Sequence, residues 1–185
     1  MGAAVVGLCS VSDETIPDAE KDLPRNLCPL IKSSYGFAKT DKCPFFYFSD
    51  LVVGETTCDG KKKMYEMLAD FKPVHVVELP NCQTEDGIQL YKKELLRFKK
   101  VLEDKFETTI TDEAILHQIK LRNGINKALR RLQYVMANDP APVNGLDVIN
   151  TVYGSGFDIK TEGLEDRINT VTDKIEKEYT EGKNI

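Results

Sequence analysis

Short apolar runs in the first half of the chain predict strands, and the polar and apolar residues between two of them predict a helix. The runs AAVVGLCS, DLVVGE and VHVVELP occupy residues 3–10, 50–55 and 74–80. Their length and β-branched content are typical of buried strands. DGKKKMYEMLADF, residues 59–71, has helical spacing. The order strand, helix, strand predicts a parallel α/β unit with crossover helices on the faces of the sheet.

Helical patterns dominate the rest of the sequence. A short acidic helix is predicted between Pro17 and Pro24, and Cys28-Pro29 and Cys43-Pro44 each predict a helix start, because proline suits the first helical position. Beyond Pro80, apolar residues recur at steps of three and four, which predicts long amphipathic helices. These helices cover residues 88–106, 112–138 and 163–182, with a proline-bearing break at 138–144.

The pattern divides the chain into an α/β, cysteine-bearing part at residues 1–82 and a helical part at residues 83–185. Three short strands make a thin sheet. We therefore expect either that the helices cover it or that another segment completes the fold, and we interpret the sequence as a partial chain.

Composition narrows the class of partner. The chain has 185 residues, 41% of them hydrophobic, which suffices for a buried core. Its net charge of -5 comes from interspersed acidic and basic residues, so nucleic acid is not an expected partner. Apolar runs are too short to span a bilayer, and MGAAVVGLCS lacks the features of a secretory signal. We expect no membrane association and a cytoplasmic location.

Cysteine usage is the most unusual feature of the composition. The five cysteines are Cys9, Cys28, Cys43, Cys58 and Cys82, and four of them fall in the first third of the chain. In a reducing compartment such clustering favours metal binding or redox chemistry over disulfides. The alternative is that they are small buried hydrophobic residues.

The stretch VVGETTCDGKKKMYE, from Val52 to Glu66, superficially resembles a phosphate-binding loop. It fails that motif because five residues separate Gly54 from Gly60 and because Lys62 stands where the magnesium-binding hydroxyl belongs. The strand-to-helix turn remains, with Thr56 and Thr57 as candidate N-caps and Cys58 beside the helix N-terminus.

The helix dipole at this turn favours a thiolate at Cys58, as would a nearby lysine among Lys61, Lys62 and Lys63. An anionic sulfur could serve as a nucleophile or as a metal ligand. A nucleophile needs a base, and the sequence links neither His75, in an apolar strand, nor His117, on an amphipathic helix, to the cysteine.

Metal ligation has more support from the spacing. Cys28, Cys43 and Cys58 are fifteen residues apart, and each lies at the start of a predicted element. Zinc sites more often show close cysteine pairs, whereas an iron-sulfur cluster accepts thiolates from distant segments. The aromatic residues Phe45 to Phe48 and Tyr35 could form an apolar shell round a cluster, although such a run is more often plain core.

Three segments make the sequence resemble a known family. NLCPLIKSSYGFA, DKCPFFYFSDLVVGETTCDGKKKMYE and VVELP are similar to the N-terminal part of the 2-hydroxyacyl-CoA dehydratase family. This family includes 2-hydroxyglutaryl-CoA dehydratase subunits and double-cubane-cluster proteins. The resemblance is dense from Gly7 to Pro80, and the helical remainder is compatible in order but carries little signature.

The resemblance implies flavodoxin-like α/β domains with a helical part and a 4Fe-4S or double-cubane cluster held by cysteines. It implies an ATP-dependent activator that supplies single electrons for the radical dehydration of a 2-hydroxyacyl-CoA in anaerobic metabolism, and a homo- or heterodimer. Carried over by position, Cys28, Cys43 and Cys58 are the expected cluster ligands. Cys9 is a further metal ligand for the double-cubane type, and Cys82 lies outside the motif.

Family members are roughly twice as long and have a second α/β half with further cysteine ligands. We therefore expect the 185 residues alone to be inactive. The alternatives are a double-cubane-cluster reductase of small molecules, a cluster-free fragment without activity of its own, and a thiol-based redox sensor that uses Cys58.

Overall fold

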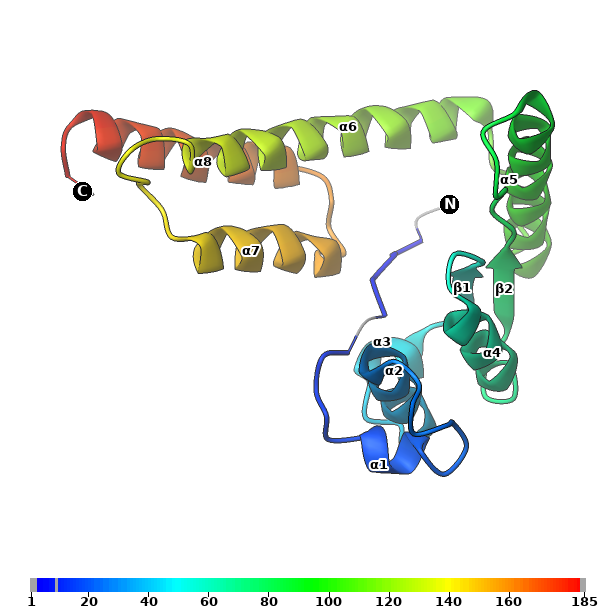
Figure 1. The fold of residues 1–185 in the computed structure, drawn as a ribbon. Coiled ribbons are helices and arrows are strands. Elements are labelled where there is room, and N and C mark those ends of the chain that lie inside the picture. The colour runs from blue at the N-terminus through cyan, green and yellow to red at the C-terminus, as the bar shows by residue number, and fades with distance from the viewer. Residues whose placement is uncertain (1–2, 9, 184–185) are drawn as a thin grey trace. The chain divides into compact units, whose positions relative to one another are not determined.

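The computed structural model describes residues 3–8 and 10–183. The chain divides into two compact units, one of residues 8–108 and one that joins residues 109 onward to the residues before Leu8 (Figure 1). A domain boundary at residue 82 stays a prediction. In the structure, the helix that follows this position packs on the strand at Val74–Val77 of the first unit.

A parallel strand pair joined by a crossover helix forms the sheet of the first unit. Its elements are α1 (Ile16–Ala19), α2 (Pro29–Lys39), α3 (Pro44–Phe48), β1 (Val52–Glu55), α4 (Asp59–Leu68), β2 (Val74–Val77) and α5 (Glu85–Lys105). The strands run parallel in a register that pairs Val52 with Val74 and Glu55 with Val77. The chain travels from β1 to β2 through α4, which confirms the predicted parallel α/β fold.

The predicted strand at residues 3–10 is wrong for the part that the structure describes. Residues 3–8 and 10 form no strand, and the sheet of the described residues has two strands rather than three. The segment lacks a hydrogen-bonded partner strand, and Val5 is 79% exposed. An apolar run becomes a strand only when a neighbouring strand satisfies its backbone groups. Cys9 lies outside the described residues.

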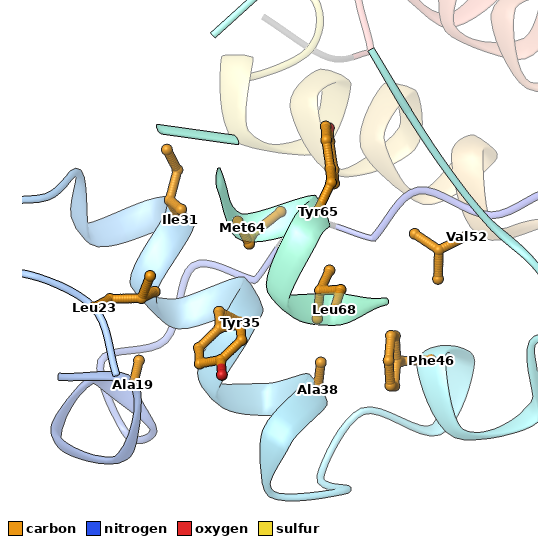
Figure 2. Packing of buried hydrophobic residues seen from close by; sticks show 10 residues of the cluster. All are labelled: Ala19, Leu23, Ile31, Tyr35, Ala38, Phe46, Val52, Met64, Tyr65 and Leu68. Carbon is orange, nitrogen blue, oxygen red and sulfur yellow. The ribbon is translucent and has the colours of Figure 1, made fainter. Parts of the chain in front are cut away.

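A buried cluster ties the helices of this unit to the sheet (Figure 2). Its members come from α1 to α4, β1 and the turn before α2, and they are Ala19, Leu23, Ile31, Tyr35, Ala38, Phe46, Val52, Met64, Tyr65 and Leu68. The Tyr35 hydroxyl donates a hydrogen bond of 2.8 Å to Asp22 Oδ2. Tyr35 and Phe46 are therefore core residues, as the simpler interpretation of the aromatic residues predicts. That interpretation is wrong for Phe45, Tyr47 and Phe48, which are exposed.

A side-chain pair on α5 occupies the outer edge of β2. The Val52 N–H donates to Pro73 O across the sheet, so the backbone groups of Val76 and Glu78 face away from β1. Arg97 Nη2 donates to Val76 O at 2.9 Å, and the Glu78 N–H donates to Glu94 Oε2 at 3.2 Å. Glu94 and Arg97 form an ion pair of 2.6 Å. The two side chains thus bond the edge groups that a third strand would otherwise bond.

The second unit consists of helices. They are α6 (Asp112–Val135), α7 (Gly145–Gly154), a short 3-10 helix η1 (Ser155–Phe157) and α8 (Leu164–Thr180). The contact between α6 and α8 buries Ile125, Ala128, Leu132, Leu164 and Ile168. This confirms the predicted helical character of the segment. Nowhere in the described residues is there a helix of sufficient length and apolarity to cross a membrane.

Gly36 is needed where α2 meets α1. A Cβ at this position would lie 2.3 Å from Thr15 O, a backbone atom that cannot rotate aside. We expect Gly36→Ala to lower the free energy of unfolding by about 1–3 kcal/mol, as overpacking usually does. Urea unfolding followed by circular dichroism measures this. Gly154→Ala is the control, because a Cβ there meets nothing within 4 Å, and it should cause no loss.

Glu94 should matter for stability because it is only 8% exposed and binds both the Glu78 N–H and Arg97. We expect Glu94→Ala to cost about 1–3 kcal/mol, since it leaves a backbone donor without its partner. Asp104→Ala, which removes an exposed ion pair with Lys100 on the same helix, should change stability by less than about 1 kcal/mol. Equal urea midpoints for the two variants would contradict the role of Glu94.

Candidate metal centre

Three cysteines stand at the N-caps of three successive helices. Cys28 precedes α2, Cys43 precedes α3 and Cys58 precedes α4. A proline follows the first two cysteines and occupies the first turn of the helix, where its missing N–H costs nothing. The structure therefore places each cysteine at the start of an element, as the sequence predicts.

The three thiols differ in their surroundings. Cys43 Sγ accepts a hydrogen bond of 3.3 Å from the Phe46 N–H and is half-buried. Cys58 is also half-buried, and both pack against the cluster of Figure 2. Cys28 is exposed at the start of α2. Two of the three thiols thus line the same apolar core, which is the low-dielectric setting that tunes a metal centre.

Two glycines of the loop-like stretch serve packing. A Cβ at Gly54 would lie 2.5 Å from Tyr65 Cε2, so the ring of Tyr65 lies against the backbone of β1. A Cβ at Gly60 would lie 2.8 Å from Ile31 Cδ1 and 2.9 Å from Leu27 Cδ1. Because Leu27 adjoins Cys28 in the chain and Gly60 follows Cys58 closely, this contact brings the starts of α2 and α4 together.

The turn between β1 and α4 is already occupied by side chains of its own. Glu55 Oε2 accepts a hydrogen bond of 2.8 Å from the Thr57 N–H, and bonds from the hydroxyl and N–H of Thr57 lower the pKa of Glu55. Thr56 Oγ1 accepts one of 2.9 Å from the Leu79 N–H. The suggestion that Thr56 or Thr57 caps the helix is wrong, since Cys58 is the N-cap. The negative charge of the Glu55 carboxylate at this turn would also repel a phosphate.

The lysines after Cys58 are each held by a carboxylate. Lys61 lies 3.7 Å from Glu55, Lys62 lies 2.9 Å from Asp59, and Lys63 lies 2.8 Å from Glu66. The hydrogen bond and the charge of Asp59 raise the pKa of Lys62. These lysine charges are thus partly neutralised by neighbouring carboxylates.

The histidines lie apart from this chemistry. His75 stacks on Phe98, with ring centroids 5.1 Å apart, and its Nε2 is buried without a hydrogen-bond partner. Burial is the largest cause that lowers the pKa of His75. His117 is exposed on α6 in the other unit. His75 is therefore a packing residue of the strand and not a base for Cys58.

Cys28, Cys43 and Cys58 are the type of ligand that iron-sulfur clusters use, since cysteine sulfur holds the iron in such clusters. Their arrangement does not supply a complete set. Among the described residues, no group of three or more cysteine, histidine or acidic side chains lies close enough to hold a metal ion. Cys82 is exposed, with its Sγ 3.3 Å from Thr84 Oγ1.

Comparison with known proteins identifies the family. The profile of 2-hydroxyglutaryl-CoA dehydratase, D-component, matches residues 1–185, which is the entire chain. The chain belongs to this family. The resemblance of the cysteine-bearing segments is thereby confirmed, and the match extends over the helical segment, where the sequence motifs alone carry little signature.

The dehydratase-family chain is also similar to the protein YjiM of Escherichia coli (strain K12), which is named as a dehydratase subunit. The two are 52% identical over 185 residues, which cover 100% of this chain and 48% of YjiM. The chain thus spans about half the length of the curated relative that it matches.

The surroundings of His75 lead to a pH prediction for this dehydratase-family chain. Because its pKa is lower in the folded state than in the unfolded state, protons bind more strongly to the unfolded chain. The contribution of neutral His75 to the free energy of unfolding is then fully present above about pH 6.5. It is lost as the pH falls from that value through the folded-state pKa of His75.

NMR titration of the His75 ring should give a midpoint below about 6.5. Absence of the resonance in His75→Phe identifies the signal. A midpoint at or above the value of a free histidine would show that burial does not govern this ring.

Proposed function

We propose that this chain is the cluster-binding part of an enzyme that removes water from a 2-hydroxyacyl-CoA, a lyase of the type named by its family. The observation that carries the proposal is the placement of three thiols at helix N-termini, two of them on one apolar core, in a chain that the dehydratase family matches from end to end.

In this proposal Cys28, Cys43 and Cys58 supply thiolate ligands to an iron-sulfur cluster. Close packing of Gly60 on Leu27 and Ile31 keeps two of the helix starts near each other, which supports ligation from both. The described residues provide fewer than a full set of ligands, so the remaining donors come from Cys9 or from polypeptide beyond this chain. A bound cluster would accept and donate single electrons.

The helix N-termini have a defined part in this chemistry. Hydrogen bonds to sulfur, such as that from the Phe46 N–H to Cys43, would tune the potential of a bound cluster. The proposed partners are an ATP-dependent activator that delivers electrons and a second subunit, with an acyl-CoA as substrate. The isolated chain, half the length of its relative, is proposed to be inactive.

Iron binding tests the proposal in a chimera in which this chain replaces the matched region of YjiM. After anaerobic purification and reconstitution with iron and sulfide, we expect Cys28→Ser, Cys43→Ser and Cys58→Ser each to retain less than about half of the iron and acid-labile sulfide. Cys82→Ser is the matched control and should retain all of it, since Cys82 lies outside the cysteine motif of the family resemblance.

The iron content of the unsubstituted chimera separates the two kinds of cluster. About four irons per subunit support the dehydratase, and about eight support a double-cubane reductase of small molecules. A colourless, iron-free chimera would refute a cluster and leave the cluster-free fragment as the better explanation.

A further inference from the structure

Lys32 is a buried lysine one turn after Cys28. The residue is 7% exposed, although a lysine ordinarily keeps its ammonium in water. Its Nζ donates a hydrogen bond of 2.7 Å to Glu20 Oε1 and one of 2.8 Å to the backbone oxygen of Arg25. These two acceptors replace water that the ammonium loses on burial.

The two ends of Lys32 hold the chain on both sides of Cys28. Its backbone N–H donates to Cys28 O at 3.1 Å, in the first turn of α2. Its side chain returns to the carbonyl of Arg25, which precedes the cysteine. The Leu27 N–H also donates to Pro24 O at 3.0 Å within this turn. The side chain of Lys32 thus closes a loop that contains Cys28.

Leu27 links this loop to the start of α4. A Cβ at Gly60 would lie 2.9 Å from Leu27 Cδ1 and 3.9 Å from Cys58 Sγ, so Leu27 packs near the second thiol. Lys32 holds the turn from which the side chain of Leu27 projects. The placement of Cys28 near the start of α4 therefore depends on the bonds that Lys32 makes.

Stability alone does not account for the ion pair of Lys32 with Glu20. A buried pair of charges contributes little net stability, because removing both charges from water costs about as much as their attraction returns. A methionine would fill similar space. The ammonium adds a direct bond to the Arg25 carbonyl, which an apolar side chain cannot make.

We propose that Lys32 is a positioning residue that fixes the turn presenting Cys28. Its side chain acts through the Glu20 carboxylate and the Arg25 carbonyl, and the backbone of the cysteine follows. The consequence for a cluster rests on the proposed function, in which Cys28 is a ligand. The ordering of the turn is independent of iron.

Backbone order at Cys28 tests this inference without iron. We expect Lys32→Met to lower the amide order parameter of Cys28 in the 185-residue chain from about 0.85 to below about 0.6, as measured by NMR relaxation. The Phe46 amide, which bonds Cys43 Sγ, should keep its value. Lys39→Met is the matched control on the same helix. It removes an ion pair with Asp22 and should leave Cys28 unchanged.

A second variant guards against loss of folding. Lys32→Met leaves the charge of Glu20, which lies 3.7 Å from Arg25 Nε. Glu20→Gln/Lys32→Met removes both charges of the buried pair, so it leaves no unpaired charge. It should show the same fall in the order parameter of Cys28. Circular dichroism measures the folding of each variant.

A double-mutant cycle in the chimera with YjiM tests the consequence for iron. Lys32→Met should lower the retained iron. When Cys28→Ser is already present, Lys32→Met should lower the iron no further, because both changes act on the same ligand. A merely structural role of Lys32 would make the two losses add.

An unchanged order parameter at Cys28 in both Lys32 variants would overturn the inference. So would an equal fall in Lys39→Met, or additive losses of iron in the cycle. An iron-free chimera would refute the proposed cluster, and the order parameter of Cys28 would still decide the role of Lys32.

Discussion

The first unit depends on the close approach of Tyr65 to the backbone of Gly54. With no side chain on β1 at this point, the tyrosine ring can lie directly on the strand, and α4 is fixed as the crossover to β2. Because α4 begins only a few residues after β1 ends, the same contact fixes the turn that carries Cys58. Gly60 then allows the first turn of α4 to pack on Leu27 and Ile31, beside Cys28.

This packing explains why the turn looks like a phosphate loop without being suited to phosphate. The glycines are there for helix packing, and the Thr57 N–H of the turn already bonds the Glu55 carboxylate. What the turn presents is a half-buried thiol at the start of a ten-residue helix. Such a group is suited in kind to soft metal ions.

The sheet of the first unit is small. It has two strands in the described residues, and side chains rather than a third strand bond the outer edge of β2. Two strands are marginal by themselves, so the stability of this sheet relies on the helices packed against it. The cysteines are also incomplete as a site, because the described residues bring two thiols to one core without forming a group that could hold a metal ion.

The sequence by itself determined the order of the main elements and the family. Local patterns suffice for that, because helical periodicity, proline after cysteine and the motif round Cys58 are properties of neighbouring residues. The same reasoning missed α7, whose start is marked by Asn144 accepting a hydrogen bond from the Asp147 N–H, a capping signal that the sequence does contain.

Only the tertiary structure decided which residues meet across the chain. The run at residues 3–8 has strand character but no partner strand, and strand formation requires one. The contacts of Gly54 with Tyr65 and of Gly60 with Leu27 join residues whose spacing follows no local rule. Glu94 looks like one more charged residue of an amphipathic helix, and its role as a partner for the edge of β2 exists only once α5 packs there.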